Sequence, residues 1–277
     1  MSVNLRMFLK RNKRLCLGLV MLALLVLVAA AAPALAPREP GAISADMVAQ
    51  PGAQYPLGTD GLGRDVLSIL IYGSRSSLMV GITAALIAAV VGTMIGVVAG
   101  YFGGKVDALI GEFINAFMMM PTFFLILIVI ALFGSGMGKV MVVIGLTSWT
   151  GNAKIMRAQA MSLRSRTFVL AAEAVGESRL RVMFTHIIPN GIFPVVANTA
   201  MGVCAAIMTE SSLSFLGLGD PNIVSWGQLI FDGKAYITSG WWMCVFGGCA
   251  IVYTVIAFFM IGEGLNVLMN PKLRSVV

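Results

Sequence analysis

The sequence predicts an all-α membrane protein with six transmembrane helices. Hydrophobic residues make up 58% of the 277-residue chain and charged residues only 11%, with a mean hydropathy of +0.93. An ordinary water-soluble domain carries about 25% charged residues, so this composition indicates a chain that lies in a lipid bilayer. A helix rises about 1.5 Å per residue and needs about 20 apolar residues to cross the hydrocarbon core. Five stretches without a charged residue are long enough for a crossing, and a sixth is marginal.

The first apolar run covers residues 15–32 and follows a basic N-terminal tail. A secretory signal peptide has the same pattern, and the Ala-Leu-Ala sequence at residues 34–36 is typical of a cleavage site. The run is longer than the usual apolar core of about 7 to 15 residues, which favours a retained membrane helix. We therefore assign residues 1–36 to a cytoplasmic basic tail and a first transmembrane helix.

The remaining charge-free stretches place the other spans along the chain. They lie at residues 76–104, 113–138, 182–209 and 235–262. The sixth candidate, residues 135–153, is shortened by Lys139, and it crosses the membrane only if the Lys139 ammonium extends outward to the interface. Pro121 follows three methionines and marks either a bend or the start of the third span.

Small residues recur at every fourth position of the second span. The members of this ridge are Ala84, Ala88, Gly92, Gly96 and Gly100. This spacing places them along one helix face, and helices in lipid associate through close van der Waals packing at such faces. We interpret the ridge as a packing surface.

The distribution of Lys and Arg predicts the orientation of the chain, because cytoplasmic loops are enriched in basic residues. With the N-terminus inside, the inner segments hold fourteen Lys and Arg residues and the outer segments hold five. Both termini are therefore predicted to be cytoplasmic. Residues 37–75 form an extracytoplasmic segment, and residues 76–277 form a five-helix core with an inner loop at about 152–190.

The sequence lacks the residues that most catalytic or cofactor sites require. Residues 133–140 resemble a phosphate-binding loop, but Phe133 and Val140 occupy the positions of its first glycine and its hydroxyl residue. There is one histidine, and the four cysteines lie in apolar stretches without metal-ligand spacing. We expect no catalytic residue, no bound metal or cofactor and no nucleic-acid partner, with membrane lipid around the chain.

The inner loop predicts a short helix, a turn and a second helix. Residues 168–176 gather small side chains, and Ala171, Ala172 and Val175 share one face by their spacing of three and four. Gly176 is a natural helix stop, and a second helical segment at 178–188 is predicted to end at Pro189. Such a rigid unit could fit a groove on a partner, whereas a solvated basic loop is the alternative.

Four segments carry a resemblance to a known family. Residues 168–176 with residues 186–190 resemble the EAA loop of ABC-importer permeases, in the form used by the dipeptide, oligopeptide and nickel branch. Residues 55–65 resemble the outer motif of that branch, residues 210–219 its late-span motif, and residues 226–234 the following loop. The chain departs from the general EAA pattern at Leu170 and His186, and from the usual ending of the branch at Asn266 and Asn270.

The resemblance implies a type I ABC-importer permease fold in a bacterial inner membrane, in which the inner loop is a coupling helix. It implies a second homologous permease, two ATP-binding subunits that hold ATP and Mg²⁺, and an extracytoplasmic substrate-binding protein. Di- or oligopeptides are the implied cargo, with nickel or a metal chelate as the alternative. Two alternatives belong to other classes of protein: a stand-alone secondary carrier needs no ATPase, and a non-transporting scaffold has partners but moves no cargo. The inner loop counts against both.

The resemblance also indicates which residues to examine. The coupling candidates are Phe168, Ala171, Ala172, Glu173, Gly176 and Pro189. The outer-motif candidates are Gly58, Thr59, Asp60, Gly63, Arg64 and Asp65, which form either a platform for the binding protein or a structural cap. The late-span candidates are Glu210, Ser211, Ser212 and Phe215, which either line the pore or pack at a helix end. We expect Arg64 to pair with Asp60 or Asp65, and Glu210 to be hydrogen-bonded.

Overall fold

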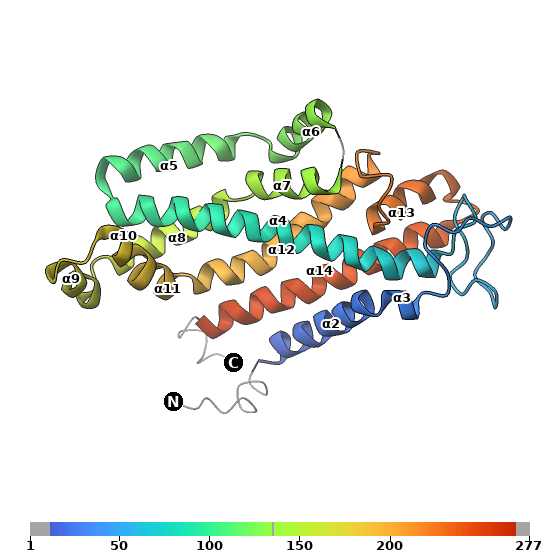
Figure 1. Ribbon diagram of the computed structural model, residues 1–277, viewed down its shortest axis with the longest axis horizontal. Coiled ribbons are helices and arrows are strands. Elements are labelled where there is room, and N and C mark those ends of the chain that lie inside the picture. The colour runs from blue at the N-terminus through green and yellow to red at the C-terminus, as the bar shows by residue number, and fades with distance from the viewer. Residues whose placement is uncertain (1–11, 135, 270–277) are drawn as a thin grey trace.

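The computed structural model describes residues 12–134 and 136–269. These residues form an elongated bundle of helices and contain no β-strand, apart from one isolated bridge between Thr59 and Asp65 (Figure 1). The basic tail at residues 1–11 and the C-terminal residues 270–277, with Asn270, lie outside the described residues. The long loop at residues 36–65 lies at one end of the bundle, and helices α9 to α11 lie at the other (Figure 1).

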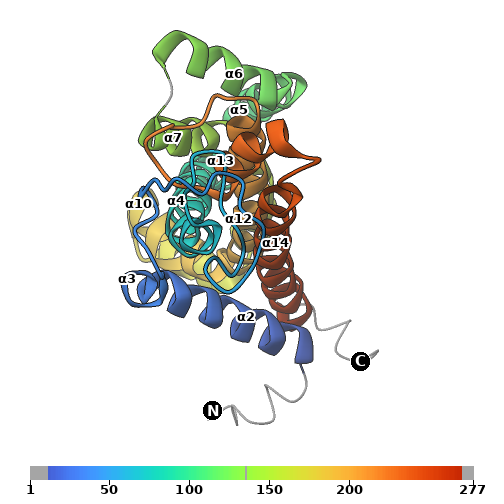
Figure 2. The same cartoon turned by 90° about the vertical axis from the view of Figure 1, so that its right-hand side faces the viewer.

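The first predicted span is helix α2, Lys13–Ala30, followed by the short helix α3, Ala32–Leu35. Asn12 caps α2 and donates a hydrogen bond from Nδ2 to the carbonyl oxygen of Gly264 at 2.9 Å. The hydroxyl of Tyr253 donates to the carbonyl oxygen of Met21 at 3.1 Å. Both bonds hold α2 against the last helix, α14, Trp241–Met269, along one side of the bundle (Figure 2).

Helix α4, Val66–Phe102, is longer than the charge-free stretch that predicted it. Asp65 caps its start by accepting a hydrogen bond from the backbone nitrogen of Ser68 at 2.8 Å. Arg75, which bounded the predicted extracytoplasmic segment, therefore lies inside the helix. Its guanidinium donates to the carbonyl oxygens of Ala29 and Ala30 at the end of α2, so that its charge is not left in contact with apolar surface alone.

The third predicted span is divided into two helices. Helix α5, Gly104–Met119, and helix α6, Thr122–Phe133, are bent by 79° at a break that contains Pro121, as the sequence suggested. Among the residues that the structure describes, four helices are long and apolar enough to cross a membrane, or five if this bent pair counts as one span. The marginal sixth candidate holds the eleven-residue helix α7, Met137–Thr147, followed by helix α8, Thr150–Leu163. Ser148 and Trp149 separate α7 from α8, so this candidate is not one continuous helix.

The ridge of small residues on α4 packs against α8. A Cβ atom added at Gly92 would lie 2.6 Å from the Cβ atom of Asn152, and one at Gly96 would overlap the carbonyl oxygen of Ala153. Only glycine permits this approach. The interpretation of the ridge as a packing surface is confirmed.

The inner loop forms helix α9, Thr167–Ala174, helix α10, Arg179–Val182, a π-helical turn at Met183–Ile187 and helix α11, Ile188–Gly191. Gly176 ends the first helix with φ at +85°, as predicted. The expected stop at Pro189 is wrong, because the chain stays helical through Pro189 as far as Gly191. A proline near the first turn of a helix loses no intrahelical hydrogen bond, and the preceding turn widens into a π-helix. We call residues 167–191 the knob.

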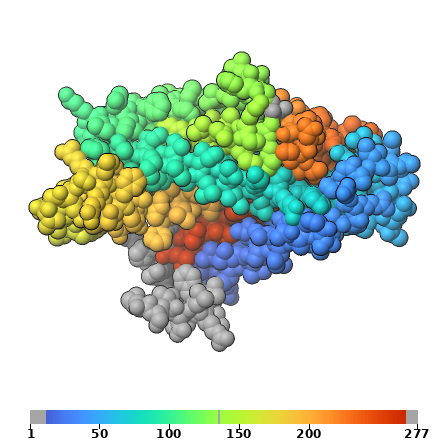
Figure 3. All heavy atoms as spheres, in the orientation of Figure 1, coloured from blue at the N-terminus to red at the C-terminus, as the bar shows by residue number. Residues whose placement is uncertain are grey.

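Helix α12, Phe193–Phe215, and helix α13, Trp226–Gly233, complete the bundle, and a short 3₁₀ turn, Lys234–Tyr236, leads to α14. Helix α12 packs between α4 and α14. Trp226 at the start of α13 is fully buried, and its indole nitrogen donates to the carbonyl oxygen of Leu70 on α4 at 3.0 Å. The 36–65 loop and α13 thus lie together at one end, and the knob projects at the other (Figure 3).

Candidate functional site

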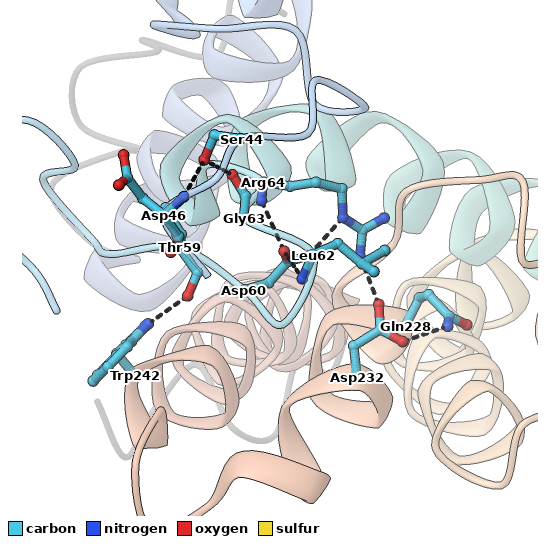
Figure 4. Close-up of polar contacts among 10 residues, drawn as sticks. All are labelled: Ser44, Asp46, Thr59, Asp60, Leu62, Gly63, Arg64, Gln228, Asp232 and Trp242. Carbon is cyan, nitrogen blue, oxygen red and sulfur yellow. Dashed lines mark hydrogen bonds and ion pairs between the residues drawn. The ribbon is translucent and has the colours of Figure 1, made fainter. Parts of the chain in front are cut away.

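The outer-motif residues fold into a tight turn at the end of the 36–65 loop (Figure 4). The carboxylate of Asp60 is buried and accepts hydrogen bonds from the backbone nitrogens of Leu62 and Arg64, at 2.9 and 2.8 Å. Gly58 and Gly63 have φ angles of +79° and +76°, which other residues resist. The turn is therefore fixed by one carboxylate and two glycines.

Arg64 joins this turn to α13. Its Nε donates to Asp60 at 2.6 Å, and its Nη2 donates to Asp232 at 2.8 Å (Figure 4). The side-chain amide of Gln228 also donates to Asp232, at 3.0 Å. The expected pairing with Asp60 is confirmed, whereas Asp65 instead caps α4 and makes no ion pair among the described residues. Asp232 lies 168 residues after Arg64 in the sequence, so the spacing of nearby charges could not predict this ion pair.

A second connection holds the turn against α14. The indole nitrogen of Trp242, a buried side chain, donates to the carbonyl oxygen of Thr59 at 3.0 Å (Figure 4). The hydroxyl of Thr59 accepts from the backbone nitrogen of Ala49 at 2.7 Å. Beside this turn is a polar cavity of about 220 Å³, lined by Arg64, Asp232 and Gln228 together with residues 221–225. The arrangement braces the loop, and it leaves an open polar depression at this end.

Glu210 lies near the same end of the bundle and is 7% exposed. Its carboxylate accepts hydrogen bonds from the hydroxyls of Ser214 at 2.8 Å, Ser225 at 3.1 Å and Ser211 at 3.4 Å. Ser225 also caps α13, by accepting from the backbone nitrogen of Gln228. Glu210 is hydrogen-bonded as expected, and it connects α12 to the start of α13.

The other late-span residues face away from this cluster. Ser212 is exposed, and its hydroxyl donates to the carbonyl oxygen of Met208 at 2.8 Å in the same helix. Phe215 is partly exposed, and the ammonium of Lys234 lies 5.2 Å from its ring centre. The structure therefore brings Glu210 and Ser211 together, and it places Ser212 and Phe215 on an outer face of α12.

The coupling candidates divide between the two faces of α9. Val169 and Ala172, which is 7% exposed, pack into a cluster with Val97, Tyr101 and Met156. Phe168 and Leu170 of α9 are exposed apolar residues, and Val175, directly after the helix, is 81% exposed. Ala171 is exposed and Ala172 is buried, so the two alanines serve different surfaces.

The knob also contains polar contacts of its own. The hydroxyl of Tyr101, at the end of α4, donates to the carboxylate of Glu173 at 2.7 Å. His186, in the π-helical turn, lies 3.0 Å from the carboxylate of Glu177. Outside the knob, the guanidinium of Arg157 on α8 forms an ion pair with Asp107 on α5. The sequence motifs contained Glu173, but its partner Tyr101 lies 72 residues away and was missed.

A groove of about 260 Å³ lies midway along the bundle between α4, α7, α8 and α12. Its walls are mostly small, and include Ala84, Ala88 and Ala205. Its polar groups are Ser148, Asn152 and Asn198, of which Asn198 donates from Nδ2 to Oδ1 of Asn152 at 2.9 Å. None of the sequence motifs marks this groove, although carboxamides within the helices of a membrane bundle are a signal for a functional surface.

Comparison with known proteins identifies the family. Residues 92–275 match the family described as "Binding-protein-dependent transport system inner membrane component", and residues 6–51 match the "N-terminal TM domain of oligopeptide transport permease C". The chain belongs to the first of these families. This confirms the resemblance that the four sequence motifs carried, and the chain is a non-catalytic membrane permease subunit.

Curated relatives match over nearly the whole chain. The dipeptide transport system permease protein DppC of Bacillus subtilis (strain 168) is 36% identical over 271 residues, which cover 96% of this chain and 84% of that protein. DppC of Escherichia coli (strain K12) is 36% identical over 276 residues, which cover 97% and 92% of the two chains. The permease family is therefore matched along its length, and not at isolated motifs.

Solved structures agree on the fold. A structure described as inward facing conformations of the MetNI methionine ABC transporter superposes with a TM-score of 0.56 at 15% sequence identity, covering 76% of this chain and 96% of that one. An amino acid ABC transporter with histidines gives a TM-score of 0.50 at 15% identity, covering 73% and 93%. At this level of identity the likeness shows a shared helical permease fold.

Proposed function

We propose that this chain forms half of the translocation pore of an ATP-driven importer of di- or oligopeptides. The observation that carries the proposal is the match over almost the full length to permeases named for dipeptide transport. These relatives are named for dipeptide transport, so we favour peptides over nickel or a metal chelate as cargo. A stand-alone secondary carrier has no support in a family whose description names a binding protein.

We further propose six membrane crossings in a bacterial inner membrane, with both termini cytoplasmic. The chain runs along the bundle through α2, α4, the bent pair α5 and α6, the successive helices α7 and α8, α12 and α14 (Figure 1). Alternating directions place the 36–65 loop and α13 at the outer end and the knob at the inner end. The basic inner segments favour the same orientation.

In this arrangement α9 is the coupling helix that docks on an ATP-binding subunit. The exposed apolar side chains of Phe168 and Leu170 on α9, and of Val175 directly after it, support this, because they lie at the end of the bundle opposite the 36–65 loop. ATP and Mg²⁺ are held by two partner ATPase subunits. This chain supplies the surface that receives their motion.

The other partners follow from the same assembly. A second homologous permease completes the pore, and an extracytoplasmic substrate-binding protein docks on the braced 36–65 loop. The groove with Ser148, Asn152 and Asn198 forms this chain's wall of the pore, because carboxamides can hydrogen-bond a peptide main chain without selecting its side chains. Membrane lipid covers much of the remaining apolar surface.

Reconstitution tests the function. The chain is purified with the proteins that accompany it, placed in liposomes with ATP inside and the copurified binding protein outside, and supplied with labelled dipeptide or with nickel. ATP-dependent accumulation of dipeptide is the expected result. Accumulation of nickel alone would replace the cargo, and dipeptide uptake by this chain without an ATPase would replace the importer with a carrier.

A further inference from the structure

The knob is joined to the transmembrane bundle by a hydrogen bond between two side chains. The hydroxyl of Tyr101, on the last turn of α4, donates to Oε1 of Glu173 on α9 at 2.7 Å. Among the described residues, this is the one side-chain hydrogen bond that α9 makes. A hydrogen bond has a preferred geometry, so it constrains the orientation of the two groups that it joins.

Apolar packing surrounds this bond but does not replace it. Val169 and Ala172 of α9 lie in one buried cluster with Val97 and Tyr101 of α4. The guanidinium of Arg179, just after α9, lies 5.7 Å from the ring centre of Phe102. Hydrophobic contact is non-directional, so it holds α9 close to α4 without fixing its rotation. The hydrogen bond fixes that rotation, and it thereby sets which face α9 presents outward.

Helix α4 continues without interruption from this contact to the other end of the molecule. Its 37 residues correspond to about 55 Å of helix. At its far end, Asp65 caps it, the indole of Trp226 donates to the carbonyl oxygen of Leu70, and the braced turn at Arg64 precedes it directly. One rigid element therefore contacts both the knob and the loop end.

We propose that Tyr101 and Glu173 are a positioning pair, which holds α9 in a fixed orientation on α4 so that a push on the knob moves α4 as a unit. The pair acts through α4 and touches neither cargo nor nucleotide. The inference rests on the proposed function, because it assigns to this contact the coupling of ATP hydrolysis to transport. The hydroxyl of Tyr101 needs only an acceptor oxygen at position 173, and the amide oxygen of glutamine can accept the same bond as the carboxylate of Glu173.

The test compares variants of the complete transporter in liposomes and measures peptides moved per ATP hydrolysed. Tyr101→Phe removes only the hydroxyl, and Glu173→Leu removes the acceptor; each should lower the ratio about tenfold while ATP hydrolysis continues. Glu173→Gln retains an acceptor oxygen and should remain within about twofold of the parent. The double variant Tyr101→Phe/Glu173→Leu should be no worse than either single change, because both remove the same bond.

Matched controls are available on the same chain. Tyr72→Phe makes the same chemical change earlier in α4, and Glu112→Leu makes it at an exposed glutamate of α5; both should leave the ratio unchanged. Parental ratios in Tyr101→Phe and Glu173→Leu would overturn the proposal. So would a loss in Glu173→Gln as large as that in Glu173→Leu, or additive losses in the double variant.

A second readout does not depend on cargo. Arg179 and Arg181 follow α9 and are exposed, so trypsin can cleave there in inside-out vesicles that hold the transporter. We expect faster cleavage in Tyr101→Phe and Glu173→Leu than in the parent, and an unchanged rate in Glu173→Gln. Equal cleavage rates in the parent and all three variants would contradict the positioning role of the pair. If the parent transports no peptide, the proposed function fails, whereas the cleavage rates still decide whether the pair positions the knob.

Discussion

At the scale of single residues, Glu210 is a buried carboxylate held by three serine hydroxyls. Two of these serines lie on α12 with it, and the third, Ser225, begins α13. This geometry favours a structural role, in which the carboxylate joins two elements. A contact with the cationic end of a peptide is the competing role, and the two roles differ in how they depend on charge.

The structural role predicts that Glu210→Gln transports peptide at close to the parental rate, because the carboxamide oxygen accepts the same hydroxyl bonds. Glu210→Ala should lower the free energy of unfolding by about 2 kcal/mol, because it leaves buried hydroxyls without an acceptor. Uptake and thermal aggregation of the purified complex measure the two effects. A Glu210→Gln variant that is as stable as the parent but no longer transports would instead assign the carboxylate to cargo.

Arg64 illustrates how far residue patterns could predict the candidate site. The spacing in residues 58–65 predicted a tight turn and an ion pair, because glycines and short-range charges act locally. The second partner, Asp232, and the indole of Trp242 reach this turn only after α13 and α14 have packed. These contacts depend on tertiary structure, so they cannot be predicted from residues that are close together in the sequence.

At the scale of elements, helix starts and stops were predicted where a local signal determines them. Gly176 and Pro121 ended or bent the chain as expected, whereas Pro189 did not. A proline interrupts a helix interior but is tolerated within a first turn, and the sequence does not show which position it occupies. The start of α4 was placed too late because a charge, Arg75, was treated as a boundary, although its guanidinium is satisfied by carbonyl oxygens of α2.

The contact between α4 and α8 predicts a sharp difference between two glycines. Gly96→Ala should destabilise the bundle by about 1–3 kcal/mol, since the new methyl group would overlap the carbonyl oxygen of Ala153. Gly248→Ala on α14 has open space around the new methyl and should be neutral or stabilising, by up to about 1 kcal/mol. Thermal aggregation of the two variants in the same detergent measures the difference. Equal stabilities would show that α4 and α8 do not approach closely.

The groove between α4, α8 and α12 makes a prediction about transport. Ala205 lines the groove and is exposed, so Ala205→Trp should fill it and lower peptide uptake at least about tenfold. Val196 is also exposed, but it lies nine residues before Ala205, which is about two and a half turns of α12, so it is on the opposite face of the helix. Val196→Trp is therefore a matched control that should retain uptake. Both variants should copurify with the partner subunits. Normal uptake by Ala205→Trp would remove the groove from the proposed pore.

At the scale of the whole molecule, the composition predicted a membrane protein of helices, and the charge-free stretches located the long apolar helices α2, α4, α12 and α14. This succeeded because crossing hydrocarbon requires about 20 apolar residues, a condition that each segment must meet on its own. The division of residues 113–153 into α5, α6, α7 and α8 could not be predicted in this way. Short helices can lie at membrane depth when neighbouring helices cover them, so their lengths depend on packing.

The orientation of the molecule makes the last prediction, because the 36–65 loop and the knob lie at opposite ends of the bundle. In a background with the four native cysteines replaced by alanine, Gly41→Cys should react with a membrane-impermeant maleimide in intact cells, since its surroundings are open. Val175→Cys, at an equally open position of the knob, should react only in inside-out vesicles or after permeabilisation. The excess of basic residues in the segments around the knob predicts this polarity. Labelling of Val175→Cys in intact cells would reverse the proposed orientation, and the knob could then not contact a cytoplasmic ATPase.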